Sequence, residues 1–231
     1  QYKSTVTKAA EAFGVSPSSV SRHFVKASAK KLKEFVERDL SGFDPFAIMI
    51  DTVHRGGMAF IVALGVDTQG KKQVLGFWQG ATENSVITLQ LFEDLERRKL
   101  KLSNEIIFIT DGGSGVISAL RSKFGQMLIH QRCTIHKDRN IQKHLAKRYR
   151  KRAHKLFKAA LSHAKYGDAK AELLKMEKWL REINPSAANS LLEALEEILT
   201  LHRLNAPEEI RKILSTTNGI ENLFSTLRHR E

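Results

Sequence analysis

The chain has 231 residues, of which 42% are hydrophobic and 27% are charged, a composition that excludes a disordered or fibrous protein. Its 38 Lys and Arg residues outnumber 25 Asp and Glu residues, and the formal net charge of +13 favours a polyanionic partner. No apolar run approaches the ~20 residues that span a bilayer, so we expect no membrane partner.

The first 40 residues predict helices. Thr7–Phe13 and Pro17–Lys26 have helical patterns separated by a turn at Gly14–Ser16, and Pro17 suits the first position of the second helix. This spacing is typical of a helix-turn-helix. In that arrangement four residues of the second helix would face a DNA groove or backbone, namely Ser18, Ser19, Ser21 and Arg22. A plain helical hairpin that supports the next domain is the alternative.

From Phe43 onwards the sequence predicts strands. Three apolar runs joined by short turns indicate an antiparallel meander, which is followed by a helix, a strand, a helix and a last strand. The expected elements are, in chain order, strands 46–54, 58–66 and 72–78, helix 84–98, strand 106–110, helix 115–124 and strand 127–131. This order predicts an α/β sheet with mixed strand directions.

The rest of the chain predicts helices. They are expected at 141–162, 168–183 and 186–204, from Pro207, and finally from about Gly219. Between Arg121 and His163 the sequence has thirteen Lys or Arg residues and one acid, Asp138. This block favours nucleic-acid binding, and a solvated basic helix face is the alternative interpretation.

Two aspartates follow apolar strand residues. Asp51 lies near the end of the first expected strand, and Asp111 directly follows the fourth. If these strands are parallel neighbours joined by helix 84–98, both carboxylates emerge at one edge of the sheet and repel unless a cation lies between them. Carboxylate oxygens favour Mg²⁺ or Mn²⁺, and a pair of such ions about 3.5–4 Å apart would serve phosphoryl transfer. An aspartate after a strand can also be only a turn former or a helix cap.

Glu221 is the third candidate acid, and its position permits two interpretations. Asn218 three residues earlier resembles a capping box, in which Glu221 would only satisfy backbone donors. Cys133 and His136 form another local signal, because they could supply two ligands of a zinc site and His130 a third. No second cysteine exists, so we expect Cys133 and His136 to pack and hydrogen-bond behind the last strand.

Six segments stand out together. In chain order they are Ile50–His54, Ala63–Lys72, Gly80–Asn84, Thr110–Gly113, Gln131–Asn140 and Ser215–Leu223. In combination they resemble the catalytic domain of bacterial Mutator-type insertion-sequence transposases, and they cover most of the chain in the family's order.

The resemblance implies a ribonuclease-H-like fold and a helix-turn-helix segment at 1–40 that binds the terminal inverted repeats. The catalytic core would comprise 41–137 and 215–231, separated by an all-helical insertion at 138–214. It implies a DDE triad of Asp51, Asp111 and Glu221, spaced by 60 and 110 positions, that binds two Mg²⁺ or Mn²⁺ ions. Cys133 and His136 match the family's Cys-x-x-His signature, to which we assign a structural or DNA-proximal role.

The function implied by the resemblance is a DNA transposase that cleaves and joins double-stranded DNA at element ends and target. We expect a homodimer in the cytoplasm, associated with the nucleoid, and the single cysteine fits a reducing cytosol. Seven basic residues are expected to neutralise phosphates, namely Lys137, Arg139, Lys143, Lys147, Arg148, Arg150 and Lys151. Family members usually carry more sequence at both ends, and Gln1 in place of a start methionine also indicates a fragment.

Two other functions stay open. A metal-dependent nuclease on the same fold would cleave DNA without joining it. A non-catalytic DNA-binding regulator would use the α/β part only as a scaffold.

Overall fold

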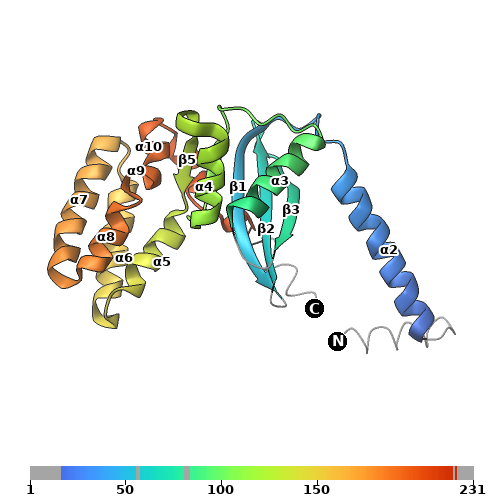
Figure 1. Cartoon of the computed structure of the whole chain (residues 1–231). Coiled ribbons are helices and arrows are strands. Elements are labelled where there is room, and N and C mark those ends of the chain that lie inside the picture. Colours follow the sequence, from blue (N-terminus) through green and yellow to red (C-terminus); the bar gives the residue numbers. More distant parts are fainter. Residues whose placement is uncertain (1–16, 56–57, 81–83, 221, 223–231) are drawn as a thin grey trace.

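A mixed five-stranded sheet forms the centre of the molecule in this computed structural model, which describes residues 17–55, 58–80, 84–220 and 222 (Figure 1). The strand order is β3-β2-β1-β4-β5. The strands are β1 (Pro45–Arg55), β2 (Met58–Asp67), β3 (Lys72–Gly80), β4 (Ile107–Thr110) and β5 (Ile129–Arg132). β1, β2 and β3 pair as an antiparallel meander, whereas β1, β4 and β5 run parallel, so the predicted mixed sheet is confirmed.

Helices cover both faces of the sheet because both faces carry apolar side chains. On one face, α3 (Ser85–Arg97) and α4 (Ser114–Phe124) pack on Ile48, Ile50 and Phe108. On the opposite face, Leu201 of α10 (Thr200–Arg203), Leu214 of α11 (Glu208–Leu214) and Ile220 pack on Ala47, Met49 and Ile109. β1 and β4 are therefore buried on both sides, which explains their continuous apolar runs.

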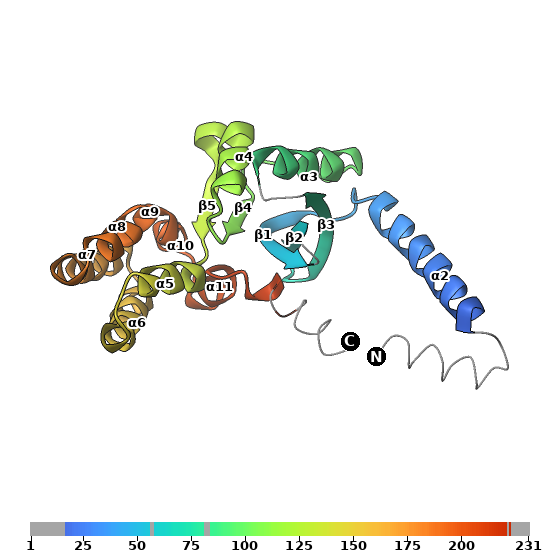
Figure 2. The same ribbon diagram turned by 60° about the horizontal axis from the view of Figure 1, so that its bottom comes forward.

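A separate helical core lies beside the sheet (Figure 2). Its helices are α5 (Thr134–Lys143), α6 (Lys147–Ser162), α7 (Tyr166–Ile183), α8 (Pro185–Leu192) and α9 (Leu195–Ile198). The continuous helices expected at 141–162 and 186–204 were wrong. The chain turns at residues 144–146 between α5 and α6, and the later segment forms the three short helices α8, α9 and α10. At the first bend, Ile141 and Ala153 on either side reach one core. At the second, α8 and α9 pack in the helical core while Leu201 of α10 packs on the sheet, an effect that helical periodicity alone does not reveal.

α2 (Pro17–Glu37) is the first helix described, and it extends away from the sheet (Figure 1). It begins at Pro17 as predicted but continues well past Lys26. The preceding helix and turn of the predicted helix-turn-helix lie outside the described residues. None of the helices in the described ranges is long and apolar enough to cross a membrane.

Candidate active site

The two candidate aspartates lie side by side at the carboxyl edge of the parallel strands. β1 pairs with β4 up to Ile50 opposite Thr110, and Asp51 and Asp111 are the next residues. The prediction that these strands are parallel neighbours is confirmed. Asp51 is not near the end of its strand, however, because β1 continues to Arg55 along β2 after its pairing with β4 has stopped.

Strand alternation determines the face on which Asp51 lies. Side chains in a strand alternate between faces, so Asp51 shares a face with Ala47 and Met49. Those two residues pack in the cluster that includes Ile220. Asp51 therefore faces the part of the chain that leads into Glu221.

Asp51 is a carboxyl group in an unfavourable environment for negative charge. It is only 7% exposed. Burial, together with the negative charge of Asp111, raises the pKa of Asp51 to about 6, although the charge of His136 and hydrogen bonds from Thr52 and Thr217 oppose the rise. Two carboxylates so close at neutral pH leave an excess of negative charge that a cation would neutralise.

Asp111 is held by the turn that follows β4. Its Oδ1 accepts a hydrogen bond of 2.9 Å from the backbone N–H of Gly113. Gly112 between them has φ of +99°, and a Cβ there would lie 1.8 Å from Nε of Arg132. The glycine is therefore required both by the left-handed backbone and by the close approach of the Arg132 side chain.

Cys133, His136 and Thr217 form a contact cluster next to these acids, which we call the Cys133–His136–Thr217 cluster. Nδ1 of His136 lies 3.2 Å from Sγ of Cys133 and 3.4 Å from the hydroxyl of Thr217. The backbone N–H of Thr217 donates to Sγ of Cys133 at 3.4 Å. Since Thr217 also hydrogen-bonds to Asp51, the cluster joins the start of α5, the final segment and the first acid.

The electrostatics of this cluster favour a proton on His136. The hydrogen bond with Cys133 raises the pKa of His136, and the charges of Asp51 and Asp111 add to the rise, although burial opposes it. Burial raises the pKa of the Cys133 thiol, but its hydrogen bonds with His136 and Thr217 outweigh that effect and lower the pKa overall. The His136 side chain therefore lies next to the acid pair in surroundings that favour its protonated form.

The segment before Glu221 is fitted tightly to the sheet. A Cβ on Gly219 would lie 2.9 Å from Cδ2 of Leu64 and 3.2 Å from Sδ of Met49, so only glycine allows this approach. Ile220 is fully buried. Residues 218–220 are already helical, so Asn218 lies inside the helix rather than at its cap, which does not favour the capping-box interpretation. Glu221 itself lies outside the described residues.

Zinc is not supported by the described side chains. His130, the possible third ligand, contacts the Thr110 hydroxyl at 2.9 Å through Nε2 and lies 3.5 Å from Glu197 through Nδ1. Within the described ranges, no three His, Cys, Asp or Glu side chains are grouped so that they could hold a metal ion. A three-acid metal site would therefore require Glu221.

Six of the seven basic residues expected to contact phosphates are exposed. They are Arg139, Lys143, Lys147, Arg148, Arg150 and Lys151. α6 carries four of them, and Figure 1 shows the α5–α6 connection at the same lower side of the molecule as the β1–β2 hairpin. The expected basic face thus exists and points into solvent.

Lys137 is the exception, and we remove it from the expected phosphate contacts. Its side chain is 1% exposed. Nζ donates to the carbonyl of Ser190 at 2.9 Å and pairs with Glu193. Arg132 also pairs with Glu193 and with Glu197. Through these ion pairs Arg132 holds β5, and Lys137 holds α5, to the helices that follow. The sequence shows the charge of both side chains but not their burial.

We predict that Lys137→Met lowers the free energy of unfolding by about 1–3 kcal/mol, because it removes a buried ammonium group that donates to the Ser190 carbonyl and pairs with Glu193, whose own side chain is 50% exposed. The salt dependence of DNA binding should not change. Lys143→Met on the same helix is the control, because Lys143 is exposed. It should reduce the salt dependence and leave stability nearly unchanged. Denaturant unfolding and fluorescence anisotropy measure the two effects, and a changed salt slope in Lys137→Met would restore Lys137 as a phosphate contact.

The helix-turn-helix residues stay untested, and Thr217 is an addition that the sequence did not indicate. Ser18, Ser19 and Arg22 lie within α2, but their side chains are not among those described. Thr217 was not singled out by the sequence analysis, although it lies inside the segment Ser215–Leu223 that carried the resemblance. A buried threonine has no distinctive sequence signal, so only its contacts reveal it.

Comparisons with known proteins show the family of the chain. Residues 4–231 match the protein family described as "Transposase, Mutator family". The chain is 29% identical over 177 residues to the transposase for insertion sequence element IST2 of Acidithiobacillus ferrooxidans, covering 75% of this chain and 57% of that protein. It is 27% identical over 223 residues to the transposase for IS6120 of Mycolicibacterium smegmatis, a match that covers 94% of this chain and 67% of that protein. It is 28% identical over 211 residues to the transposase for ISRM5 of Rhizobium meliloti, a match that covers 87% of this chain and 51% of that protein. The chain thus spans between about half and two thirds of these relatives.

Proposed function

The chain belongs to the Mutator family of transposases, and from that membership we propose that it carries the catalytic part of a DNA transposase. It would cleave DNA strands at the ends of an insertion sequence and transfer the freed 3′ ends to target DNA. The observation that carries this proposal is the side-by-side placement of Asp51 and Asp111 at the carboxyl edge of β1 and β4. Fold class alone would not carry it, because function depends on the site.

We assign the sheet to the ribonuclease-H-like class. The support is an antiparallel meander continued by parallel strands, with helices on both faces and the acids at the central strands. The position of the acids is where ligands collect in open α/β sheets.

The acid pair fits divalent cations. Asp51 and Asp111 offer only oxygen ligands, and burial together with the charge of Asp111 raises the pKa of Asp51, so a bound cation would stabilise its ionised form. Asp51, Asp111 and Glu221 would hold two Mg²⁺ or Mn²⁺ ions. Such ions activate the attacking oxygen and stabilise the departing 3′-oxygen in phosphoryl transfer.

The protein's own part in this chemistry is to position the three acids. β1 and β4 fix two of them through backbone pairing, and the backbone N–H of Gly113 orients the Asp111 carboxylate. Gly219 and Ile220 hold the segment that leads into Glu221 against the same face of the sheet. We assign to Cys133 and His136 the structural role of tying that segment to α5 through Thr217.

We predict that Thr217→Val raises the Mn²⁺ concentration needed for half-maximal DNA cleavage about 10–100-fold, the effect of losing hydrogen bonds to charged groups. The shape of the side chain is retained, so the fold should persist. Thr217→Ser keeps the hydroxyl and should restore cleavage at the lower concentration. A Mn²⁺ titration of plasmid nicking, with Mn²⁺ binding followed independently by electron paramagnetic resonance, measures the effect. Equal Mn²⁺ affinity in all three proteins would contradict the positioning role.

The partners follow from the same proposal. Double-stranded DNA would lie along the exposed basic residues of α5 and α6, and the segment containing Ser18, Ser19 and Arg22 would bind the element ends. Pairing of two ends would use a homodimer. We place this activity in the cytoplasm, at the nucleoid.

The test is a joining assay. The chain, Mn²⁺ and a supercoiled plasmid are incubated with labelled duplexes that carry the terminal repeats flanking its gene, and label covalently attached to plasmid is measured. We expect nicked plasmid and joined label. Nicking without joining would identify the metal-dependent nuclease instead. DNA binding with no nicking in any divalent metal would identify the non-catalytic regulator.

A further inference from the structure

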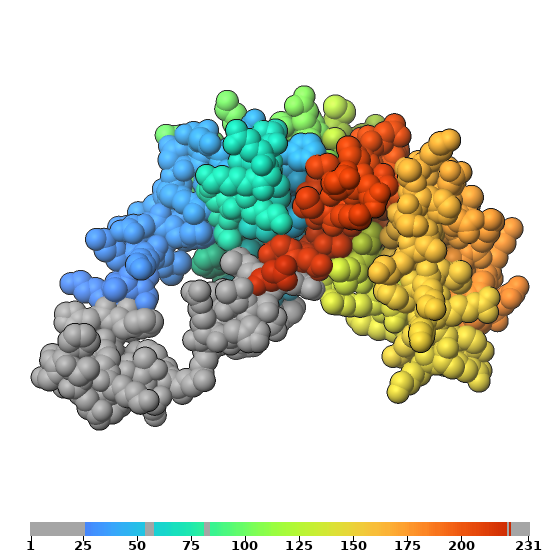
Figure 3. All heavy atoms as spheres, turned by 180° about the vertical axis from the view of Figure 1, so that it is seen from behind, coloured from blue at the N-terminus to red at the C-terminus, as the bar shows by residue number. Residues whose placement is uncertain are grey.

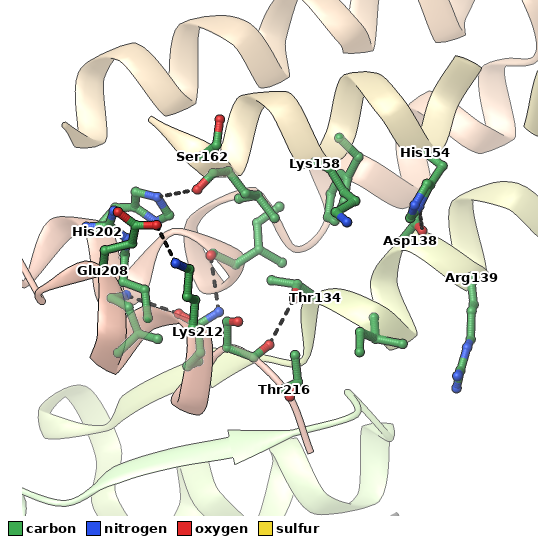
Figure 4. Close-up of a pocket in the computed structure, with 18 of the residues that line it drawn as sticks. Thr134, Asp138, Arg139, His154, Lys158, Ser162, His202, Glu208, Lys212 and Thr216 are labelled. Carbon is green, nitrogen blue, oxygen red and sulfur yellow. Dashed lines mark hydrogen bonds and ion pairs between the residues drawn. The ribbon is translucent and has the colours of Figure 1, made fainter. Parts of the chain in front are cut away.

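A cavity of about 780 Å³ lies between α5, α6, α10 and α11, and we propose that it binds one unpaired nucleotide of the DNA strand, with the base inside and the phosphate at the rim (Figure 4). This inference rests on the proposed action on DNA. The cavity is distinct from the acid pair, since neither Asp51 nor Asp111 lines it.

The inner wall of the cavity is apolar. Phe157 and Leu161 come from α6, and Ile198 and Leu201 come from α9 and α10 on the other side. Paired and stacked bases in a duplex cannot present their faces to such a wall. An unpaired base can, because its planar faces are apolar and available for packing.

The rim of the cavity is cationic. Lys158 and Arg139 lie on the α6 and α5 side, and Arg211 and Lys212 lie on α11. Lys158 is exposed and continues the row of basic residues along α6, whereas Lys212 forms an exposed ion pair of 2.6 Å with Glu208. Figure 3 shows α11, in red, beside the yellow and light-orange residues of α6. A ligand with an apolar planar part and an attached phosphate matches this combination.

Two lining side chains also have acceptor atoms without partners among the described residues. Gln142 and His154 both contact Oδ2 of Asp138, and Oδ1 is left without a hydrogen bond. Nε2 of His202 lies 3.2 Å from the carbonyl of Leu161, so Nδ1 is the acceptor, and it too has no partner. Asp138 is 8% and His202 is 4% exposed.

Buried acceptors without donors are unfavourable, and the N–H groups of a base would satisfy them. Both atoms are shielded from water, so we expect binding to rotate these side chains. Figure 4 shows Asp138 and His202 at opposite sides of the cavity.

The cavity also adjoins the acid site. Thr134 and Thr216 line it, and their chain neighbours Cys133 and Thr217 belong to the cluster that contacts Asp51. A DNA strand that is cleaved beside Asp51 and Asp111 would thus place a nearby unpaired nucleotide in the cavity.

The test compares binding of a duplex with a three-nucleotide 2-aminopurine flap and of the same duplex fully paired, using the whole chain. Two variants change the cavity, Lys158→Ala at the rim and Ser162→Trp, which fills the mouth from an exposed lining position. Lys155→Ala is the control, because Lys155 is exposed on α6 and does not line the cavity. Anisotropy gives affinity, and 2-aminopurine fluorescence reports the environment of the base.

We expect Ser162→Trp to weaken flap binding about tenfold, the effect of losing one stacked base, and to change duplex binding less than twofold. Lys158→Ala removes a phosphate contact and should weaken binding of the flap more than binding of the duplex. Lys155→Ala should affect flap and duplex equally. Equal losses for flap and duplex in the cavity variants would overturn the inference, and absence of duplex binding by the unchanged chain would instead contradict the proposed function. A free 2-aminopurine nucleotide that binds as tightly as the flap, and is lost in Ser162→Trp, would replace the DNA strand by a free nucleotide as the ligand.

Discussion

Asp51→Asn is expected to abolish DNA cleavage and to make the protein more stable. Loss of a metal-binding carboxylate should reduce nicking of supercoiled plasmid in Mn²⁺ by about 10³-fold or more. The same change removes a buried negative charge next to Asp111. Stability above pH 7 without metal should therefore rise by about 1–3 kcal/mol, since burial and Asp111 have raised the pKa of Asp51 to about 6 from 3.8.

The stability gain should depend on pH in one direction. A carboxyl group with a raised pKa in the folded state favours folding while it is protonated, and this contribution is lost as the pH rises from about 4 through about 6. The difference in melting temperature between Asp51→Asn and the unchanged chain should thus be small at pH 4 and largest above pH 7. Thermal unfolding in a chelator across this range measures it.

Asp67→Asn is the matched control for this experiment. Asp67 lies in the β2–β3 turn, where its Oδ1 accepts hydrogen bonds of 2.9 Å from the backbone N–H groups of Gln69 and Lys71. Its replacement should lower stability and leave cleavage unchanged. Asp111→Asn and Glu221→Gln should lose cleavage as Asp51→Asn does. Cleavage that survives in any of these three variants would show that the assigned triad is wrong.

Reversal of charge on α6 should produce the second large effect. Lys147 and Lys151 are exposed and lie one turn apart near the start of the helix. Lys147→Glu with Lys151→Glu should weaken duplex binding about 10–100-fold at low salt and reduce the slope of log affinity against log salt by about 1.8, the contribution of two phosphates. The helix should persist, because acidic residues are favourable in its first turn.

A second double variant separates local contacts from net charge. Lys72 and Lys101 are exposed at the start of β3 and between α3 and β4, and neither belongs to the basic residues of α5 and α6. Lys72→Glu with Lys101→Glu changes the net charge equally and should leave the salt slope almost unchanged. Equal slopes for both double variants, measured by anisotropy between 50 and 300 mM salt, would remove α6 from the DNA interface.

The sequence predicted the sheet well because strand signals are local. The apolar runs, the short turns and the helix between the third and fourth strands made parallel pairing of β1 and β4 a possibility, and the structure shows that pairing. That pairing brings Asp51 next to Asp111 without any further information. The sequence was less successful in the helical segment, where helices expected at 141–162 and 186–204 are interrupted. Helical periodicity reports which face is apolar, and it does not report where a helix bends to share a core.

The sequence shows how many basic residues the block contains, and the tertiary structure decides which of them are buried in ion pairs and which are exposed. Lys137 and Lys147 belong to the same basic block, yet one is buried against Glu193 and the other is exposed. The two differ only in what the fold places next to them, because a lysine is buried where a distant carboxylate can pair with it.

By itself the sequence determined the family, the strand order along the chain and the two aspartates at one edge of the sheet, because motifs and local hydrophobic patterns encode these features. Only the tertiary structure brought Cys133, His136 and Thr217 together beside Asp51, and only it formed the cavity between α6 and α11. These contacts join residues more than 80 positions apart in the case of Thr217 and Cys133. Such long-range contacts arise when helices and strands pack together, so local sequence patterns do not predict them.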